Sequence, residues 1–246
     1  MRNVILICVC ICSSFIASAQ DNMERGKITL GLRVGVNESF YYVSGSPDGR
    51  MRNGLVEGLY MNYALSEKFS LQTELYFVQT GSFGATDMSG TYEDSSMDTP
   101  ISYDYTLTGE SSFKNNYLAL PILFCYHFGD SPWKVFGGFR FGLLLSSNHD
   151  WEGELVVMDE QGENLAPNVV IDNLIYDKYE KVDFKQMDYS ISLGVHYKVR
   201  NLPLGIDLRT TYGLNDVNKN TTEEHDNWMK NGGIQFSVTY DLWKSR

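Results

Sequence analysis

Residues 188–199 read DYSISLGVHYKV, and this stretch decides the fold. Apolar and polar side chains alternate without interruption along it. One face holds Tyr189, Ile191, Leu193, Val195, Tyr197 and Val199, and the other holds Asp188, Ser190, Ser192, Gly194, His196 and Lys198. Because successive side chains of a β-strand point to opposite sides, this period of two predicts a strand with one apolar and one polar face.

The same alternation recurs along the chain and predicts further strands. Five of them are clear, at 28–37, 69–80, 133–145, 202–214 and 234–242, and two are less regular, at 53–64 and 116–128. Their connections alternate in length. Tight turns are expected near 65–68, 129–132 and 200–203, and long polar loops near 41–53, 82–115, 147–183 and 215–231. This alternation of short and long connections predicts an all-β fold, an eight-stranded antiparallel up-and-down transmembrane β-barrel with both termini in the periplasm.

Alternation alone also suits a soluble barrel, which would bury its apolar face. Two features favour a barrel with lipid outside. Charges of both signs lie in mid-strand on the polar face, where they could pair inside a narrow lumen, and aromatic residues flank the tight turns, where rings belong at the lipid headgroups. We expect the lumen network to consist of Arg33, Glu74, Arg140, Asp207, Arg209 and Asp241. The turn-flanking aromatic residues are Tyr63, Phe69, Phe128, Trp133, Tyr197 and Trp243.

The first residues have the layout of a secretory signal peptide. Arg2 is followed by an apolar run from Val4 to Ile16, and Ala17-Ser18-Ala19 supplies the small residues of a cleavage site. We therefore expect residues 1–19 to be a cleaved signal peptide and residues 20–246 to form the outer-membrane β-barrel domain. Three of the four cysteines lie in that peptide, so only Cys125 remains and no internal disulfide can form.

Composition narrows the functional classes. The formal net charge of −11 argues against binding nucleic acid, whose phosphates need a basic surface. The four histidines form no metal motif, no serine stands at triad spacing from a histidine, and no phosphate loop or paired-cysteine motif occurs. We expect no cofactor, no bound metal and no enzymatic activity.

Pro121 lies within an expected strand. Because proline has no backbone N–H to donate to the neighbouring strand, we expect it to sit at a bulge.

Four segments also resemble a known family. They are 71–77 (LQTELYF, followed by Gly81), 117–128 (YLALPILFCYHF), 137–145 (GGFRFGLLL) and 207–215 (DLRTTYGLN). In order and spacing they resemble the PorT-like outer-membrane β-barrel family of Bacteroidota, with 117–128 similar to its YLxxPxLxxY strand. The resemblance implies the fold and the bacterial outer membrane. One member type is associated with gliding motility and type IX secretion.

We therefore expect a non-enzymatic outer-membrane barrel that serves as a structural anchor or interaction platform, with a link to secretion or cell-envelope assembly. Expected partners are outer-membrane lipid, lipopolysaccharide and other envelope or secretion proteins. Two alternatives stay open: a small-solute channel or transport component, and a soluble periplasmic ligand-binding barrel. Because about eight strands enclose an interior that side chains can fill, we expect little or no conduction.

Overall fold

The computed structural model describes residues 25–43, 50–94, 101–158, 164–165, 183–219 and 228–245. The expected signal peptide at 1–19 lies outside these residues. Within them, no helix is long and apolar enough to cross a membrane.

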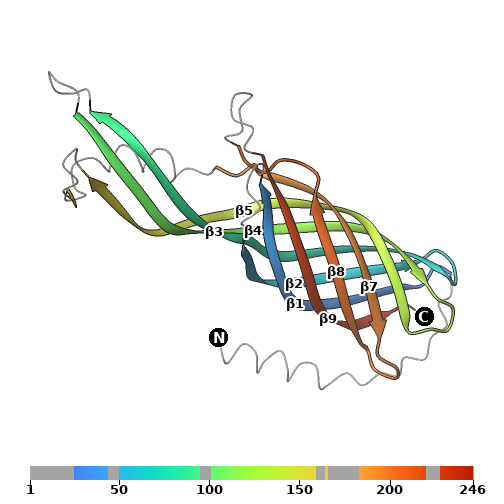
Figure 1. Ribbon diagram of the computed structural model, residues 1–246. Helices are drawn as coiled ribbons and strands as arrows, with labels where there is room; N and C mark the ends of the chain where they lie inside the picture. Colours follow the sequence, from blue (N-terminus) through green and yellow to red (C-terminus); the bar gives the residue numbers. More distant parts are fainter. Residues whose placement is uncertain are drawn as a thin grey trace.

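Nine strands make up one antiparallel sheet (Figure 1). Their bounds are β1 Ile28–Val43, β2 Arg50–Ala64, β3 Phe69–Asp94, β4 Ile101–His127, β5 Trp133–Met158, β6 Asn164–Leu165, β7 Met187–Lys198, β8 Leu204–Gly213 and β9 Met229–Lys244. Each long strand pairs with the next one along the chain, β5 pairs with β7, and β9 returns to pair with β1. Eight strands therefore close into a ring, which confirms the predicted fold class. The two-residue strand β6 lies outside that ring, on the far end of β5.

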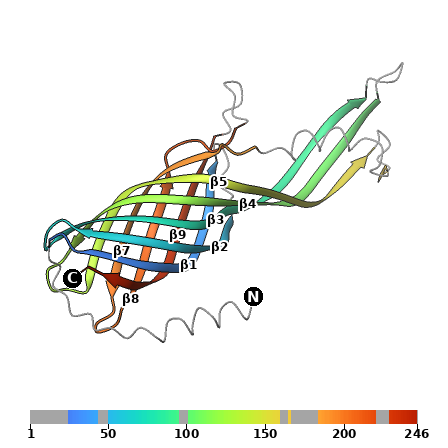
Figure 2. The ribbon, with the colours of Figure 1, turned by 180° about the vertical axis from the view of Figure 1, so that it is seen from behind.

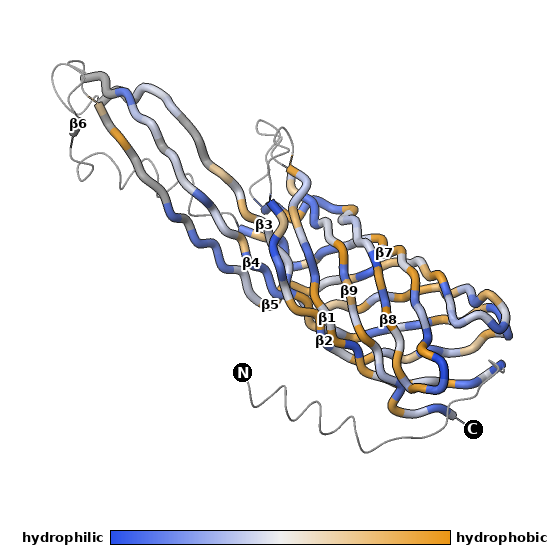
Figure 3. Tube along the Cα trace, turned by 60° about the horizontal axis from the view of Figure 1, so that its bottom comes forward, coloured by the Kyte–Doolittle hydropathy of each residue, from blue (hydrophilic) through white to orange (hydrophobic). Residues whose placement is uncertain are grey.

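The apolar face of each barrel strand points outward. Leu193 is 56% exposed and Phe236 is 49% exposed, whereas Arg209 on the opposite face of the wall is 1% exposed. Figure 3 shows the alternation of hydrophobic and hydrophilic residues along the barrel strands. A soluble barrel would bury the apolar set, so the exposed apolar belt is the surface that hydrocarbon covers. Glu57 is an exception, because it is exposed in the middle of β2 between Leu55 and Leu59.

Aromatic rings border this belt at both ends. At the end with the tight turns, Phe69 packs on Tyr126 with ring centroids 5.3 Å apart, and Trp133 packs on Tyr197 at 4.9 Å. Near the opposite rim, Tyr42 packs on Tyr212 at 5.2 Å. Rings with a polar tip prefer the boundary between headgroups and hydrocarbon, so the two girdles mark the membrane-spanning part of the wall.

The tight turns all lie at one end of the barrel, together with the end of β9 (Figure 1). They connect β2 to β3, β4 to β5 and β7 to β8, as expected from the sequence. Gly129 and Asn201 provide the positive φ angles, 58° and 62°, that two of these turns need. In the first turn, the Leu65 amide donates to the Phe69 carbonyl at 2.9 Å.

The prediction of long loops near 82–115 and 147–183 is wrong in part, because strands β3, β4 and β5 extend into these segments. Strand β3 last pairs with β2 at Arg50 and Phe83 but continues beside β4 to Asp94, and β4 continues beside β5 to Met158. Residues 84–94, 101–112 and 146–158 therefore form a three-stranded extension that projects past the barrel rim, away from the tight turns (Figures 1 and 2). The segment is rich in Thr, Ser and Tyr, which form strands well, but it lacks the one-sided apolar pattern that revealed the barrel strands.

The expectation that Pro121 sits at a bulge is also wrong. The β3–β4 ladder pairs Thr73 with Ile122 and next pairs Tyr76 with Ala119, so two positions are skipped without a change of register. The Thr73 hydroxyl donates to the Pro121 carbonyl at 3.2 Å, which ties the proline to the neighbouring strand. The register shift in β4 falls instead at Asn116 and Tyr117, opposite β5.

Candidate functional site in the barrel lumen

Four charged side chains meet across the middle of the lumen. Glu74 of β3 accepts from Arg209 of β8, at 2.8 Å from Nη2 and 3.0 Å from Nη1, and forms an ion pair with Arg33 of β1. Asp207 of β8 lies 3.2 Å from Arg33 Nη2 and 3.1 Å from Arg209 Nε. All four side chains are at most 1% exposed. Two guanidinium groups and two carboxylates therefore form a compact cluster without net charge.

The cluster forms because inward positions of β1, β3 and β8 face one another across the barrel. These strands are not neighbours in the ring, so the pairs of Glu74 and Asp207 with arginines of other strands cross the lumen, whereas the Asp207–Arg209 pair lies along β8. Ring faces complete the contacts, with Arg209 4.9 Å from the Phe136 centroid and Arg33 5.1 Å from that of Tyr76. Buried charges persist only when they are paired and hydrogen-bonded, and each of the four charged groups is paired here, although Arg33 Nε has no hydrogen-bond acceptor among the described residues.

Three further polar side chains extend this cluster. Gln72 Nε2 donates to Glu74 Oε1 at 2.6 Å, and its own Oε1 accepts from Lys134 Nζ at 2.7 Å. On the other side, Arg33 Nη2 donates to Ser237 Oγ at 2.9 Å. The sequence did not single out Gln72, Lys134 or Ser237 as members of the network. Their inward position in alternating strands was the signal that could have found them.

Arg140 lies apart from the four-residue cluster. It forms an ion pair with Asp188 of β7, and its Nε donates to Ser190 Oγ at 2.8 Å. Both charged side chains are at most 2% exposed. Asp188 was expected on the polar face of its strand but not as a site residue. Because Asp188 and Gly142 are cross-strand partners, the carboxylate lies within reach of Arg140.

Asp241 belongs to the barrel mouth at the tight-turn end. Its carboxylate lies 2.5 Å from Lys198 Nζ and 3.8 Å from Lys244 Nζ, and it accepts from the Tyr60 hydroxyl. The side chain is 15% exposed, unlike those of the central cluster. The six expected network residues are thus all paired, but in three separate places.

The other end of the lumen is closed by apolar side chains. Tyr41, Phe184, Val217 and Met229 form a buried cluster against Phe113 and Val43. The Tyr41 and Phe184 ring centroids lie 5.6 Å apart. Inward residues of β4 are also mostly apolar, and Leu123 and Cys125 pack on Phe136. The lumen is therefore filled by side chains of both kinds, and its β4 side departs from the expected polar lining.

Few side chains among the described residues are arranged as a catalytic or metal-binding site would require. Ser70 Oγ lies 3.0 Å from His127 Nε2, a contact that sequence spacing did not suggest. Ser70 is fully buried and also accepts from Asn62 Nδ2 at 3.0 Å, so its oxygen does not face a substrate-sized opening. Within the described ranges, no three His, Cys, Asp or Glu side chains gather as a metal site.

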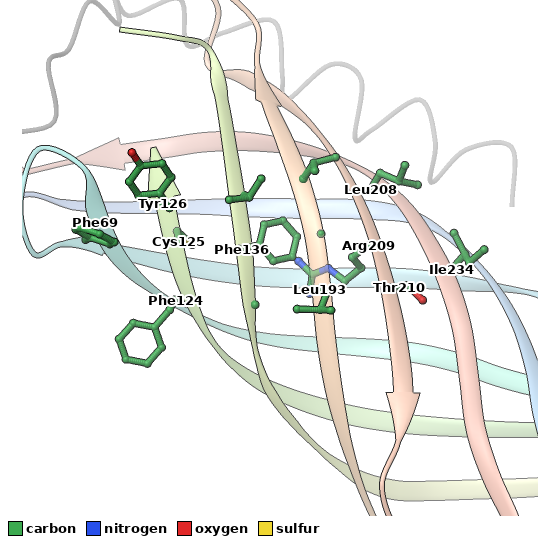
Figure 4. A pocket seen from close by; sticks show the side chains of 14 residues that line it. Phe69, Phe124, Cys125, Tyr126, Phe136, Leu193, Leu208, Arg209, Thr210 and Ile234 are labelled. Carbon is green, nitrogen blue, oxygen red and sulfur yellow. The ribbon is translucent and has the colours of Figure 1, made fainter. Parts of the chain in front are cut away.

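A groove of about 780 Å³ is lined by residues of the barrel wall, among them Phe124, Leu193 and Leu208 (Figure 4). Gly137 also lines it. Gly137 pairs with Phe124 on one side and Leu193 on the other. Since glycine has no side chain, the end of the Leu193 side chain lies over it, 2.8 Å from where a Cβ atom of residue 137 would stand. The lining is mainly apolar, and most of it belongs to the lipid-facing belt, although the inward-facing residues Cys125, Phe136 and Arg209 also contribute.

The comparison with protein families agrees with this architecture. Residues 18–219 match the family described as "Outer membrane protein beta-barrel domain". No curated protein matches the chain. Solved structures similar in fold include Neisserial surface protein A (12% identity, 89% of this chain and 100% of that one, TM-score 0.41) and Ail of Yersinia pestis (11%, 89% and 99%, TM-score 0.32). OprG of Pseudomonas aeruginosa is 12% identical over 90% of this chain and 98% of its own, with a TM-score of 0.32. Because the family match covers most of the chain, the protein belongs to the outer membrane protein β-barrel domain family, whose members reside in the bacterial outer membrane.

Proposed function

We propose that this protein is a non-enzymatic outer-membrane anchor that presents the β3–β5 extension as an interaction platform for another envelope or secretion protein. The observation that carries the proposal is the extension itself. Beyond Phe83, the outer edge of β3 pairs with no other strand in the described part of the chain. Such an edge offers a row of backbone donors and acceptors to which an extended segment can add as a further strand.

The filled lumen favours an anchor over a channel. The central ion pairs cross the barrel, and the apolar cluster around Phe184 closes the far end. Each would have to move before a solute could pass. A small-solute channel remains the second candidate because the lumen wall carries many polar groups. The resemblance to PorT-like proteins supports secretion or envelope assembly as the setting of the platform.

A photo-crosslinking residue in intact outer membranes tests the platform. The test position is Ser89, on the β3 edge of the extension, and the control is Leu71, on the lipid-facing belt. We expect a discrete protein adduct from Ser89 that is absent from Leu71. The extension can be shortened by replacing residues 86–109 with Asn-Gly, which leaves the Ala85 and Glu110 pair to close a shorter hairpin. Because this extension-shortened variant lacks position 89, it serves the conductance measurement below and not the crosslinking. Equal adducts at both positions, or none at Ser89, would contradict the proposal.

Planar-bilayer recording separates the anchor from the channel. We expect the refolded barrel to show no stable unitary current at physiological salt. A large, reproducible single-channel current would favour the channel instead. The extension-shortened variant is the matched sample, because it leaves the barrel wall and its lumen unchanged.

A further inference from the structure

The three-stranded extension carries charge of one sign. Residues 84–94, 101–112 and 146–158 contain eight aspartates and glutamates but neither lysine nor arginine. The whole chain has 31 acidic and 20 basic residues, so these three short segments supply most of its acidic excess. Four of the acidic side chains are described by the structure, and all four are exposed: Asp104, Glu110, Asp150 and Glu152.

Three of these carboxylates lie together on one face of the extension. Glu110 of β4 and Glu152 of β5 are direct cross-strand partners, and Asp150 lies opposite Ser112 on the same two strands. Like charges that lie directly opposite each other destabilise a sheet. Among the described residues, the one lysine or arginine that pairs with a carboxylate of the extension is Arg50. This acidic face therefore keeps a surplus of negative charge.

The Arg50–Glu110 pair shows how a cation beside β3 reaches the acidic face. Arg50 begins β2 and pairs with Phe83, the last β3 position that β2 covers in the described part of the chain. Its guanidinium group forms an ion pair with Glu110 on β4, one strand further away, and both side chains stay more than half exposed. Ala85 is the β3 partner of Glu110, and its short side chain leaves the way open. A long basic side chain on the strand next to β3 can therefore cross β3 to a carboxylate of β4.

The same geometry continues along the outer edge of β3, which pairs with no other described strand beyond Phe83. Ser89 and Thr91 lie on the same face as Ala85, because side chains of a strand alternate. All three side chains are short and exposed. Thr91 lies opposite Asp104 of β4 and donates to its Oδ1 at 2.9 Å. A strand added here would take the place that β2 holds within the barrel wall, with carboxylates in reach of its basic side chains.

We propose that the partner of the extension is a basic extended segment, with lysine or arginine at alternate positions, which adds to the β3 edge and directs these side chains over the acidic face. The inference rests on the interaction platform proposed above and names the chemistry of its partner. Main-chain pairing at the edge supplies affinity, and the alternate side chains supply selectivity. A neutral strand would meet the same backbone groups but would leave Glu110 and Glu152 without added positive charge.

Photo-crosslinking with defined peptides tests the partner chemistry on the full-length protein, refolded in phosphatidylcholine vesicles. The probes are three peptides of equal length with the repeats Lys-Thr, Gln-Thr and Lys-Pro. The Lys-Pro peptide keeps the charge, but its prolines cannot donate to a strand edge. The crosslinking residue stands at Ser89 on the β3 edge, and the control position is the exposed Ser147 on β5, at the opposite side of the extension.

We expect the Lys-Thr peptide to give at least about fivefold more adduct at Ser89 than either other peptide, because several exposed ion pairs act together with edge pairing. Added salt should reduce this adduct, since it screens exposed charges. The double variant Glu110→Gln/Glu152→Gln should lower it to the level of the Gln-Thr peptide. The matched control is Asp130→Asn, which removes an exposed carboxylate from a tight turn at the other end of the barrel and should leave the adduct unchanged.

Equal adducts from the Lys-Thr and Gln-Thr peptides would overturn the basic partner but leave the platform standing, because the edge would still accept a strand. Equal adducts from Lys-Thr and Lys-Pro would overturn it as well, since charge alone would then hold the peptide. Adducts mainly at Ser147 would place the peptide on β5 and contradict the assignment to β3. No adduct from any peptide would also overturn the proposal, and the carboxylates would then serve to keep the edges of two copies apart. The platform itself stands or falls with the cellular adduct at Ser89.

Discussion

Replacement of Glu74 by leucine is the sharpest test of the lumen cluster. Glu74 accepts from two arginines and from Gln72, and its removal leaves Arg33 and Arg209 to share Asp207 alone. One of two buried guanidinium groups then has no matching charge. Breaking a buried ion pair by removing one partner costs about 3–5 kcal/mol. We expect Glu74→Leu to lower the free energy of unfolding by that amount.

Urea unfolding in lipid vesicles, followed by tryptophan fluorescence, measures the loss. The matched control is Asp241→Asn, because Asp241 lies at the partly exposed mouth, where an ion pair contributes about 0–1 kcal/mol. The double variant Glu74→Leu/Arg209→Leu removes one charge of each sign and leaves the Arg33–Asp207 pair at 3.2 Å. It should recover at least half of the stability lost in the single variant.

A loss below about 1 kcal/mol in Glu74→Leu would refute this reasoning, because a buried unmatched guanidinium group costs more than that. Losses that simply add in the double variant would refute it as well. Additivity would mean that Glu74 and Arg209 contribute independently, which their two contacts at 2.8 and 3.0 Å do not allow.

Two further predictions concern the barrel wall. Glu57→Leu removes an exposed carboxylate from the apolar belt, so we expect the free energy of unfolding in vesicles to rise by about 1–2 kcal/mol; a decrease would show that Glu57 is not lipid-facing. Gly138→Ala should lower it by at least about 2 kcal/mol, because the new Cβ would lie 2.0 Å from the rigid Ile122 carbonyl oxygen. Gly137→Ala should change it by less than about 0.5 kcal/mol, because there the Cβ meets only the movable end of Leu193 at 2.8 Å. Equal effects at the two glycines would contradict this account of the wall.

The barrel strands were predictable because the bilayer imposes a simple rule on them. Residues such as Leu193 and Phe236 must face hydrocarbon while Arg33 and Glu74 must not, so hydropathy alternates with every residue. The extension obeys no such rule, since water surrounds both of its faces, and residues 84–94 therefore looked like a loop. In β4 the inward residues are mostly apolar, like the outward ones, so the two faces of this strand differ little in hydropathy and the alternation was hard to see.

The sequence predicted which charged side chains point into the lumen better than it predicted which of them form ion pairs with one another. Alternation placed Arg140 and Arg209 on the same side of the wall but could not assign their partners. Partners depend on the tilt and stagger of the strands, which bring β3 opposite β8 across the barrel. Hence Arg209 meets Glu74, whereas Arg140 meets Asp188, a residue that sequence reasoning had left out of the site.

The seam between β1 and β9 has a consequence for how the barrel enters its membrane. The first and last strands of the ring join along fifteen paired positions, from Thr29 opposite Lys244 to Val43 opposite Met229. Until the final strand arrives, both β1 and β8 present open edges that hydrocarbon cannot solvate. Insertion and ring closure must therefore proceed together, and a nascent chain interrupted before Met229 has no stable half-inserted form to occupy.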